Sequence, residues 1–380
     1  PAEGGDVSVI GPTGGRTRPH FTTDPDRIYS YGVVPGDSAS PPGPGQPPLA
    51  PVALVSTRWD GTDLRRHLRV AWRLPIAPGG RAASRTTDLV LPHDFEREPP
   101  VPLVTADLVL MAPRGDLALV QANNDLYVVT VPRLGGAVPT VTLGPPDSAA
   151  MPVRKLTDIG GEFPAWGADG RTVHWSIGNA HVVYDLERAR AFDDSVRRAR
   201  RSTDTTRADT AARAAQGRTP TYQPEERRIR IVAQRDIPTG SAVLRGARVI
   251  TMKGREIIEN ADVVVTNNRI RAVCPRGRVN VPPDARIIDV SGKTIVPGFV
   301  DTHAHLRLPA GIHREQIWSY AANLAYGVTT ARDPQTGTTD VLSYEDQVTA
   351  GRILGPRIYS TGPGVFSSEN IRDLEHARRV

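Results

Sequence analysis

Residues 295–305 read IVPGFVDTHAH, an apolar run and a Pro-Gly break followed by Asp301, His303 and His305 at alternate positions. In a β-strand, residues two apart point to the same face, so these three side chains are expected to face one way. Two imidazoles about 6–7 Å apart along a strand are able to bind one divalent cation. The stretch therefore predicts the end of a strand that carries a pair of metal ligands.

Strand and helix patterns alternate after this stretch. The amphipathic run QIWSYAANLAYG predicts a helix that ends at Gly327, because glycine readily adopts the left-handed conformation that closes helices. Alternation at this spacing is typical of a parallel sheet or a (β/α)₈ barrel. The predicted elements are a helix at 316–327, a strand at 327–333, a helix at 339–354, a strand at 356–365 and the start of a helix at 371–380.

Three further residues are expected at the same end of the predicted barrel strands. His313 lies in the first strand-to-helix loop, and Arg332 and Asp333 end the second strand. Active sites of (β/α)₈ barrels lie at the carboxyl ends of the strands. These side chains are therefore candidates for substrate contact, with a surface or supporting role as the alternative. Residues 300–380 predict the first three βα units of a (β/α)₈ barrel of the TIM type.

Residues 229–299, ahead of the histidine pair, predict a small β-sandwich. The stretches RIRIVAQ, AVLRGARVITM, ADVVVTNNRIRAVC and ARIIDVSGKTIVPGF alternate apolar and polar residues, as half-buried strands do. Asn267 and Asn268 separate two of these runs and suit a tight turn, because asparagine tolerates left-handed backbone angles. The sandwich is expected to lead straight into a strand that ends near His305.

Residues 1–186 repeat one theme, in which an apolar entry and a turn of Pro, Asp and Gly precede an alternating strand. Hairpins that recur in this way predict blades of a β-propeller, with unrelated hairpins as the alternative. The copy FPAWGADGRTVHW resembles the repeats of TolB-like β-propellers, and the insert at 35–48 is expected to be a surface loop. The three copies of the theme lie at 20–31, 110–121 and 165–175.

Residues 187–228 are polar and poor in branched apolar side chains, so they predict a linker that is partly helical or disordered. The net charge of +6 and the pI near 9.7 raise nucleic acid as a partner. However, only three of the 47 basic residues are lysine, and the run RRARR at 197–201 has no interleaved aromatic residue to stack on bases. We therefore expect no nucleic-acid partner.

Length and composition set the remaining limits. A chain of 380 residues is too long for one ordinary domain, and 35 glycines with 35 prolines indicate a turn-rich, multidomain protein. The single cysteine, Cys274, excludes an internal disulfide. No run approaches the roughly 18 apolar residues of a membrane span. An export signal ahead of Pro1 would make the protein exported or periplasmic, so the compartment stays open, as does the oligomeric state.

The stretches LRGARVIT, ADVVVTNNRIRAV, IIDVSGKTIVPGFVDTHAH and GVTTARD resemble, in order and spacing, the amidohydrolase superfamily of metal-dependent hydrolases. The resemblance covers 243–380, and PGFVDTHAH is its most specific part. It implies that His303 and His305 ligate a divalent metal, most often zinc, with one or two metals per complete enzyme. Asp301, on the same face of the predicted strand, is expected to orient the two imidazoles. The resemblance also implies that metal-activated hydroxide hydrolyses a carbon–nitrogen bond, usually of a small amide or cyclic amide.

The resemblance further predicts that the chain is a fragment cut at both ends. The family completes its site with a carboxylated lysine or a glutamate, two later histidines and an aspartate that acts as general acid and base. A full barrel takes about 250 residues, whereas only about 80 follow the first barrel strand here, so these groups are expected beyond Val380. The chain alone is expected to be inactive. The alternative is a propeller-based binding or scaffold protein whose barrel remnant carries no chemistry.

Overall fold

The computed structural model describes residues 17–34, 49–73, 103–132, 138–144, 151–204, 220–306, 308–309, 312–365, 371 and 373–379. The chain divides into two compact units, one of Pro1–Arg230 with Val365–Val380 and one of Ile231–Gly364. The described residues are mostly β-sheet with few helices, and their strands close no barrel. No helix among them has the length and apolarity that a membrane span requires. The loop expected at 35–48 lies outside the described residues.

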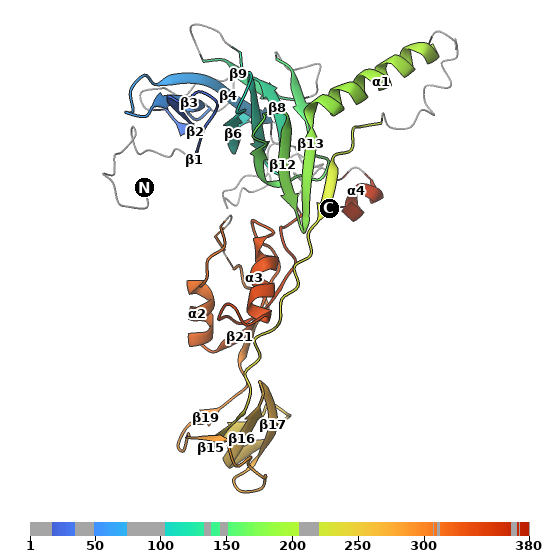
Figure 1. Cartoon of the computed structure of the whole chain (residues 1–380). Helices are drawn as coiled ribbons and strands as arrows, with labels where there is room; N and C mark the ends of the chain where they lie inside the picture. Colours follow the sequence, from blue (N-terminus) through green and yellow to red (C-terminus); the bar gives the residue numbers. More distant parts are fainter. Residues whose placement is uncertain are drawn as a thin grey trace, which may run out of the picture. The chain divides into compact units, whose positions relative to one another are not determined.

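The first unit contains three sheets (Figure 1). The first sheet has the order β1 (Thr17–His20), β2 (Arg27–Val33), β3 (Val52–Arg58), β4 (Arg65–Arg73), β5 (Leu103–Thr105), with β9 (Thr140–Leu143) parallel to β4. The second has the order β10 (Val153–Lys155), β8 (Asp125–Thr130), β7 (Leu117–Ala122), β6 (Leu108–Met111). The third has the order β11 (Glu162–Trp166), β12 (Thr172–Ile177), β13 (Ala180–Asp185), β14 (Glu225–Arg228).

The repeated theme in the sequence corresponds to a pair of antiparallel strands at each of its three copies. These pairs are β1 with β2, β6 with β7 and β11 with β12. A second hairpin follows the later two copies, and its turn contains a residue with a positive φ angle, Asn123 (φ 55°) or Gly178 (φ 54°). Asparagine and glycine tolerate this conformation best. The structure thus confirms the predicted hairpins.

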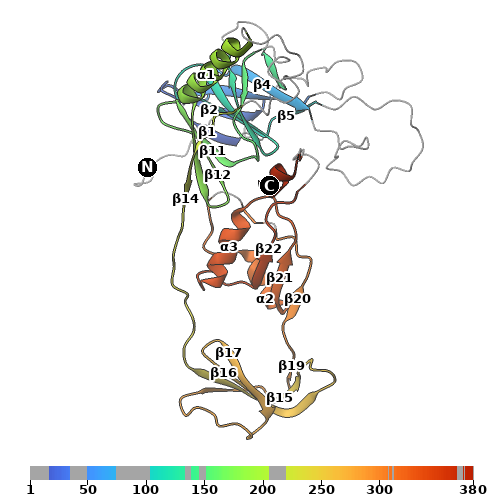
Figure 2. The same cartoon turned by 90° about the vertical axis from the view of Figure 1, so that its right-hand side faces the viewer.

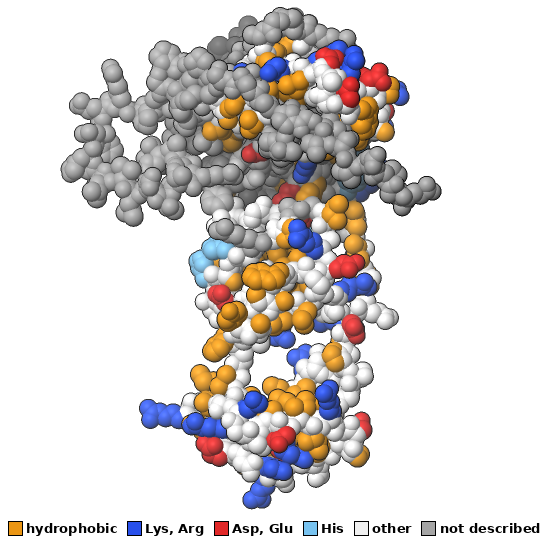
Figure 3. Space-filling view, turned by 90° about the vertical axis from the view of Figure 1, so that its left-hand side faces the viewer, with side chains coloured by type: hydrophobic (Ala, Val, Ile, Leu, Met, Phe, Trp, Pro, Cys, Tyr) orange, Lys and Arg blue, Asp and Glu red, His pale blue; other side chains and the backbone are white. Residues whose placement is uncertain are grey.

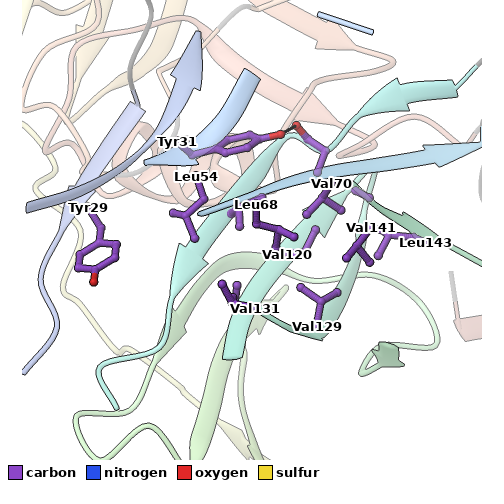
Figure 4. Packing of buried hydrophobic residues seen from close by; sticks show 14 residues of the cluster. Tyr29, Tyr31, Leu54, Leu68, Val70, Val120, Val129, Val131, Val141 and Leu143 are labelled. Carbon is purple, nitrogen blue, oxygen red and sulfur yellow. Dashed lines mark hydrogen bonds between the residues drawn. The ribbon is translucent and has the colours of Figure 1, made fainter. Parts of the chain in front are cut away.

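The second sheet is buried on both faces, because one face packs on the first sheet and the other on the third. Neighbouring strand residues point to opposite faces, so alternate residues enter two different cores. Val109, Ala118, Val120 and Val129 join the core shared with the first sheet (Figure 4). Leu108, Leu110, Leu119, Leu126 and Val128 join the core shared with the third sheet.

Two aromatic side chains donate hydrogen bonds to backbone carbonyls around the second sheet. The Tyr31 hydroxyl donates to the carbonyl of Ala106 at 3.1 Å, and the Trp166 indole Nε1–H donates to the carbonyl of Leu110 at 3.0 Å. The first bond is buried and lies at the connection between β5 and β6, and the second is partly buried and joins the third sheet to the second. Stacked antiparallel sheets of this kind are the arrangement found in propeller blades, but a propeller remains a prediction here.

Helix α1 (Leu186–Asp204) follows β13 directly. The Asp185 carboxylate accepts the backbone N–H groups of Glu187 and Arg188 at 2.9 and 3.0 Å, which caps the first turn of the helix. Ala189 packs against the third sheet and is fully buried. The segment predicted to be a polar linker, 187–228, therefore contains most of α1 and the edge strand β14.

The second unit begins with a five-stranded sheet. Asn267 and Asn268, with φ angles of 53° and 68°, form the tight turn between its β16 and β17 strands, as predicted. Gly246 has a φ angle of 86° where the pairing of β15 shifts, so it forms a bulge that few other residues would tolerate. The order is β17 (Arg269–Pro275), β16 (Ile257–Thr266), β15 (Ser241–Ile250), β18 (Arg286–Asp289), with β19 (Thr294–Ile295) beside β15.

The region 229–299 differs from its prediction in two ways. Its strands form one sheet instead of the two layers of a sandwich, around a small core at Ala247, Val249, Ala261 and Val263. After Arg228, the last residue of β14, the stretch IRIVAQ (229–234) forms no strand, and its Ile231 is 87% exposed. Alternation of apolar and polar residues indicates an extended backbone, but a strand forms only where a neighbouring segment pairs with that backbone.

A parallel sheet of β20 (Phe299–Asp301), β21 (Val328–Asp333) and β22 (Arg357–Ser360) follows, as the alternating pattern predicted. Helices α2 (Trp318–Ala325) and α3 (Asp340–Thr349) pack on it (Figure 2), and Tyr320 and Tyr344 from these helices share a core with Ala331 and Ile358 from the strands. The helix predicted to start within 371–380 corresponds to α4 (Leu374–Arg379).

Two boundaries of the predicted helices are set by glycines. Gly327 has a φ angle of 83° and ends α2, as expected from the sequence. Helix α3 was predicted to reach residue 354 but ends at Thr349, because Gly351 has a φ angle of 80°. The left-handed conformation of Gly351 prevents another helical turn.

Candidate metal centre

Strand β20 ends at Asp301, four residues before the predicted end near His305. The Asp301 carboxylate accepts the backbone N–H of His303 at 3.0 Å, so the side chain bends its own backbone out of the strand. The chain still runs beside β21, because the N–H of Ala304 donates to the carbonyl of Arg332 at 2.9 Å. A local side-chain hydrogen bond thus ended the strand early without removing it from the sheet.

The two histidines of the pair face the same way although the strand has ended. Ala304 and Leu306 are buried in the core of the parallel sheet, whereas His303 and His305 are exposed. Histidine side chains, coloured pale blue, form a group on the surface of the part of the chain that contains β20, β21 and β22 (Figure 3). Exposed and buried residues therefore alternate from His303 to Leu306, which places both imidazoles outside the core.

The spacing of the two imidazoles fits a shared cation. Their ring centroids lie 5.0 Å apart and their planes cross at 78°. Zinc–nitrogen bonds of about 2.0–2.1 Å with tetrahedral angles place the centroids of two ligating imidazoles roughly 5 Å apart. The pair thus needs little rearrangement of its ring spacing to bind one metal ion.

One nitrogen of His305 already has a partner. Its Nδ1 lies 3.2 Å from the backbone carbonyl of Gln335, and because a carbonyl can only accept, Nδ1 must carry the proton. The Nε2 atom of the neutral ring then keeps its lone pair for a metal. Metal-binding histidines commonly have such a partner on their other nitrogen. The sequence did not point to Gln335, because the contact is made by a backbone carbonyl and not by a side chain.

His313 is placed in the first loop as predicted, but its ring is bound to helix α3. Its Nε2 lies 3.0 Å from a carboxylate oxygen of Asp340, its Nδ1 accepts from the Gln347 amide at 3.3 Å, and its ring packs on Tyr344. Both ring nitrogens are therefore occupied. The structure does not bring His313 into the histidine pair.

The two candidates at the end of β21 have different surroundings. Arg332 is exposed, whereas Asp333 is fully buried. The carboxylate of Asp333 accepts the backbone N–H groups of Leu306 and Gln335, each at 3.0 Å. Burial, with a smaller contribution from this carboxylate, raises the pKa of Tyr320 above its usual value. Tyr320 therefore remains a neutral hydroxyl within the core.

Within the described part of the chain, no group of three or more His, Cys, Asp or Glu side chains is arranged to hold a metal ion. The donor set that the structure assembles is the pair of imidazoles, with Asp301 bonded to the backbone next to them. Two imidazoles are borderline ligands that suit zinc and related divalent metals. The remaining coordination positions would be filled by water or by other groups.

Comparison with known proteins gives partial matches. The chain is 37% identical over 117 residues to an allantoinase of Streptomyces avermitilis, which covers 29% of this chain and 25% of the relative. It is 31% identical over 146 residues to an adenine deaminase of Deinococcus deserti, covering 37% of this chain and 24% of the relative. A dihydroorotase of Listeria monocytogenes is 36% identical over 75 residues, which is 20% of this chain and 16% of the relative.

The chain thus spans a quarter or less of the length of these curated relatives. Among solved structures, phenylurea hydrolase B is 26% identical, with 33% of this chain and 31% of that chain covered, at a TM-score of 0.27. That score is too low to establish a shared fold. No protein-family model matches the chain. The sequence relatives support the placement of this chain in the amidohydrolase superfamily.

Proposed function

We propose that this chain supplies the first metal-binding segment of a metal-dependent amidohydrolase that hydrolyses a carbon–nitrogen bond of a small molecule. The observation that carries the proposal is the exposed pair His303 and His305, with ring centroids 5.0 Å apart and one ring oriented by the carbonyl of Gln335. The relatives named allantoinase, adenine deaminase and dihydroorotase support the reaction class.

His303 and His305 would hold the metal, most often zinc, through one ring nitrogen each. A divalent metal bound there would activate water and polarise the carbonyl of an amide. Asp301 fixes the backbone at His303, and Gln335 fixes the ring of His305. The chain thus contributes ligands and their orientation. The proton transfers of hydrolysis need a further acid–base group, which we place outside this chain together with the other ligands.

The proposal includes the architecture of the complete enzyme. The parallel strands β20–β22 with α2 and α3 represent the beginning of a (β/α)₈ barrel, and the histidine pair lies at the carboxyl end of its first strand. The stacked sheets of the first unit represent blades of a β-propeller. Substrate is a small amide or cyclic amide, with one or two metals per complete site.

An activity assay on the protein encoded by the complete gene tests this function. Hydrolysis of allantoin, dihydroorotate and related cyclic amides is measured before and after metal removal by a chelator, and again after addition of zinc. We expect hydrolysis that chelation abolishes and zinc restores, and that is lost in His303→Ala but retained in His174→Ala. Metal-independent hydrolysis contradicts the proposal. If the complete protein binds no metal and hydrolyses no amide, a binding or scaffold role takes its place.

A further inference from the structure

The buried carboxylate of Asp333 connects two segments that meet at the histidine pair. Its side chain is fully buried at the end of β21, where an ionised group requires hydrogen-bond donors. One oxygen accepts the N–H of Leu306, in the segment after β20, and the other accepts the N–H of Gln335, in the turn after β21. Both bonds are 3.0 Å long. The carboxylate therefore holds these two segments at a fixed separation.

Each of these two amides adjoins a group that determines the state of His305. Leu306 is the next residue along the chain, so its amide fixes the backbone that carries the imidazole. Gln335 supplies the carbonyl that accepts the Nδ1–H of His305 at 3.2 Å. The same carboxylate thus positions both partners of the hydrogen bond that determines which ring nitrogen of His305 is free.

We infer that Asp333 is a positioning residue, which holds His305 as the Nδ1–H tautomer with Nε2 free to bind a divalent metal. The inference rests on the proposed function in taking His305 as a ligand. Its structural part, the tautomer, stands on hydrogen bonds within the metal-free chain. The sequence made Asp333 a candidate for substrate contact, with a supporting role as the alternative, and its burial and its two backbone partners favour the supporting role.

The exposed side chain of Gln335 offers a matched control at the same turn. Gln335→Ala keeps the backbone N–H and the carbonyl, so it preserves both bonds. Gln335→Pro removes the N–H that Asp333 accepts but keeps the carbonyl. Asp333→Asn replaces one carboxylate oxygen with an amide that cannot accept, so one of the two backbone donors loses its partner. The Asp333→Asn and Gln335→Pro variants are expected to loosen the turn.

The test is nitrogen-15 NMR of the histidine rings in the metal-free full chain near pH 8, where the two tautomers give different nitrogen shifts, with His305→Gln identifying the signal. We expect His305 to be mainly the Nδ1–H tautomer in the parent chain and in Gln335→Ala. In Asp333→Asn and Gln335→Pro we expect a mixture of tautomers, and zinc affinity lower by about 10- to 100-fold. Circular dichroism checks that each variant is folded.

The outcomes separate this inference from the proposed function. Unchanged His305 shifts in a folded Asp333→Asn chain overturn the positioning role, even if zinc binds. If Asp333→Asn does not fold, Gln335→Pro decides the matter by the same criterion. If the parent chain shows the Nδ1–H tautomer and both variants lose it, but zinc binds to none of them, the positioning role stands and the ligand assignment fails.

Discussion

At the scale of single residues, the three histidines after β20 have different roles despite their closeness in the sequence. His303 and His305 are exposed and have ring centroids 5.0 Å apart, whereas His313 is bound by Asp340 and Gln347 of helix α3. The sequence placed all three at the same end of the sheet. Only the contacts with α3 show that the third ring serves to fix its loop.

The first prediction concerns His313. His313→Ala removes a ring that bonds both Asp340 and Gln347, so we expect a loss of stability of about 1–2 kcal/mol. Zinc affinity should stay within about twofold of the parent chain, because both ring nitrogens of His313 bond to side chains of α3 and the ring is not a metal ligand. Urea unfolding and zinc titration of the same variant measure the two effects. Loss of zinc binding on this substitution would show that His313 is a ligand.

At the scale of elements, the hydrogen bond from the Trp166 indole to Leu110 connects the third sheet with the second. Trp166→Phe removes the donor to the carbonyl of Leu110, and because this carbonyl lies between packed sheets, water replaces the donor poorly. We expect a loss of about 1–2 kcal/mol in urea unfolding. Trp59→Phe is the matched control, since the bond from Trp59 to Pro25 is exposed and water can replace it. Equal losses for both variants would argue against a packed interface between the second and third sheets.

The first sheet is expected to lose stability in acid. Burial, with the nearby guanidinium groups of Arg27 and Arg65, lowers the pKa of His67 from 6.5 to about 4, and its Nε2 lies 2.8 Å from the Ser56 hydroxyl. Burial likewise lowers the pKa of His20, whose Nε2 accepts the N–H of Met111 at 2.8 Å. The unfolded chain binds more protons than the folded chain below pH 6.5, so stability is complete above that pH and falls toward pH 4.

Hydrogen exchange measures this dependence strand by strand. Between pH 7.5 and pH 5, after correction for intrinsic exchange rates, protection of the amides in β2, β3 and β4 should fall. Protection in β16, whose sheet contains no histidine, serves as the internal reference. His67→Gln should reduce the dependence, because glutamine does not titrate. Equal changes in β3 and β16 would mean that the buried histidines do not set the acid response.

Elements with local signals were predictable from the sequence, and those fixed by distant contacts were not. The turn at Asn267 and the end of α2 at Gly327 followed from residues that favour positive φ angles. The end of β20 was placed too late, because the hydrogen bond from His303 to Asp301 ends the strand. The partner of His305 could not be predicted, since it is a carbonyl 30 residues away.

At the scale of the whole molecule, the sheets of the first unit and the parallel sheet each share a core with a neighbouring sheet or with helices, whereas the five-stranded sheet has a small core of its own. The stacked sheets of the first unit have two such cores, and the parallel sheet has another beneath α2 and α3. The histidine pair lies on the surface of this last sheet, outside its core. Substitution of either histidine is therefore expected to change metal binding with little effect on folding.

Zinc titration by calorimetry on the full chain tests the central claim, that His303 and His305 bind one metal ion. The control is a second histidine pair, His174 and His181, whose rings are 5.2 Å apart but stacked, with facing nitrogens 3.1 Å apart and bonded to each other. We predict one zinc ion per chain in the parent and in the His174→Ala/His181→Ala variant, and none in His303→Ala/His305→Ala. Zinc binding that survives in the last variant and disappears in the control would contradict the account.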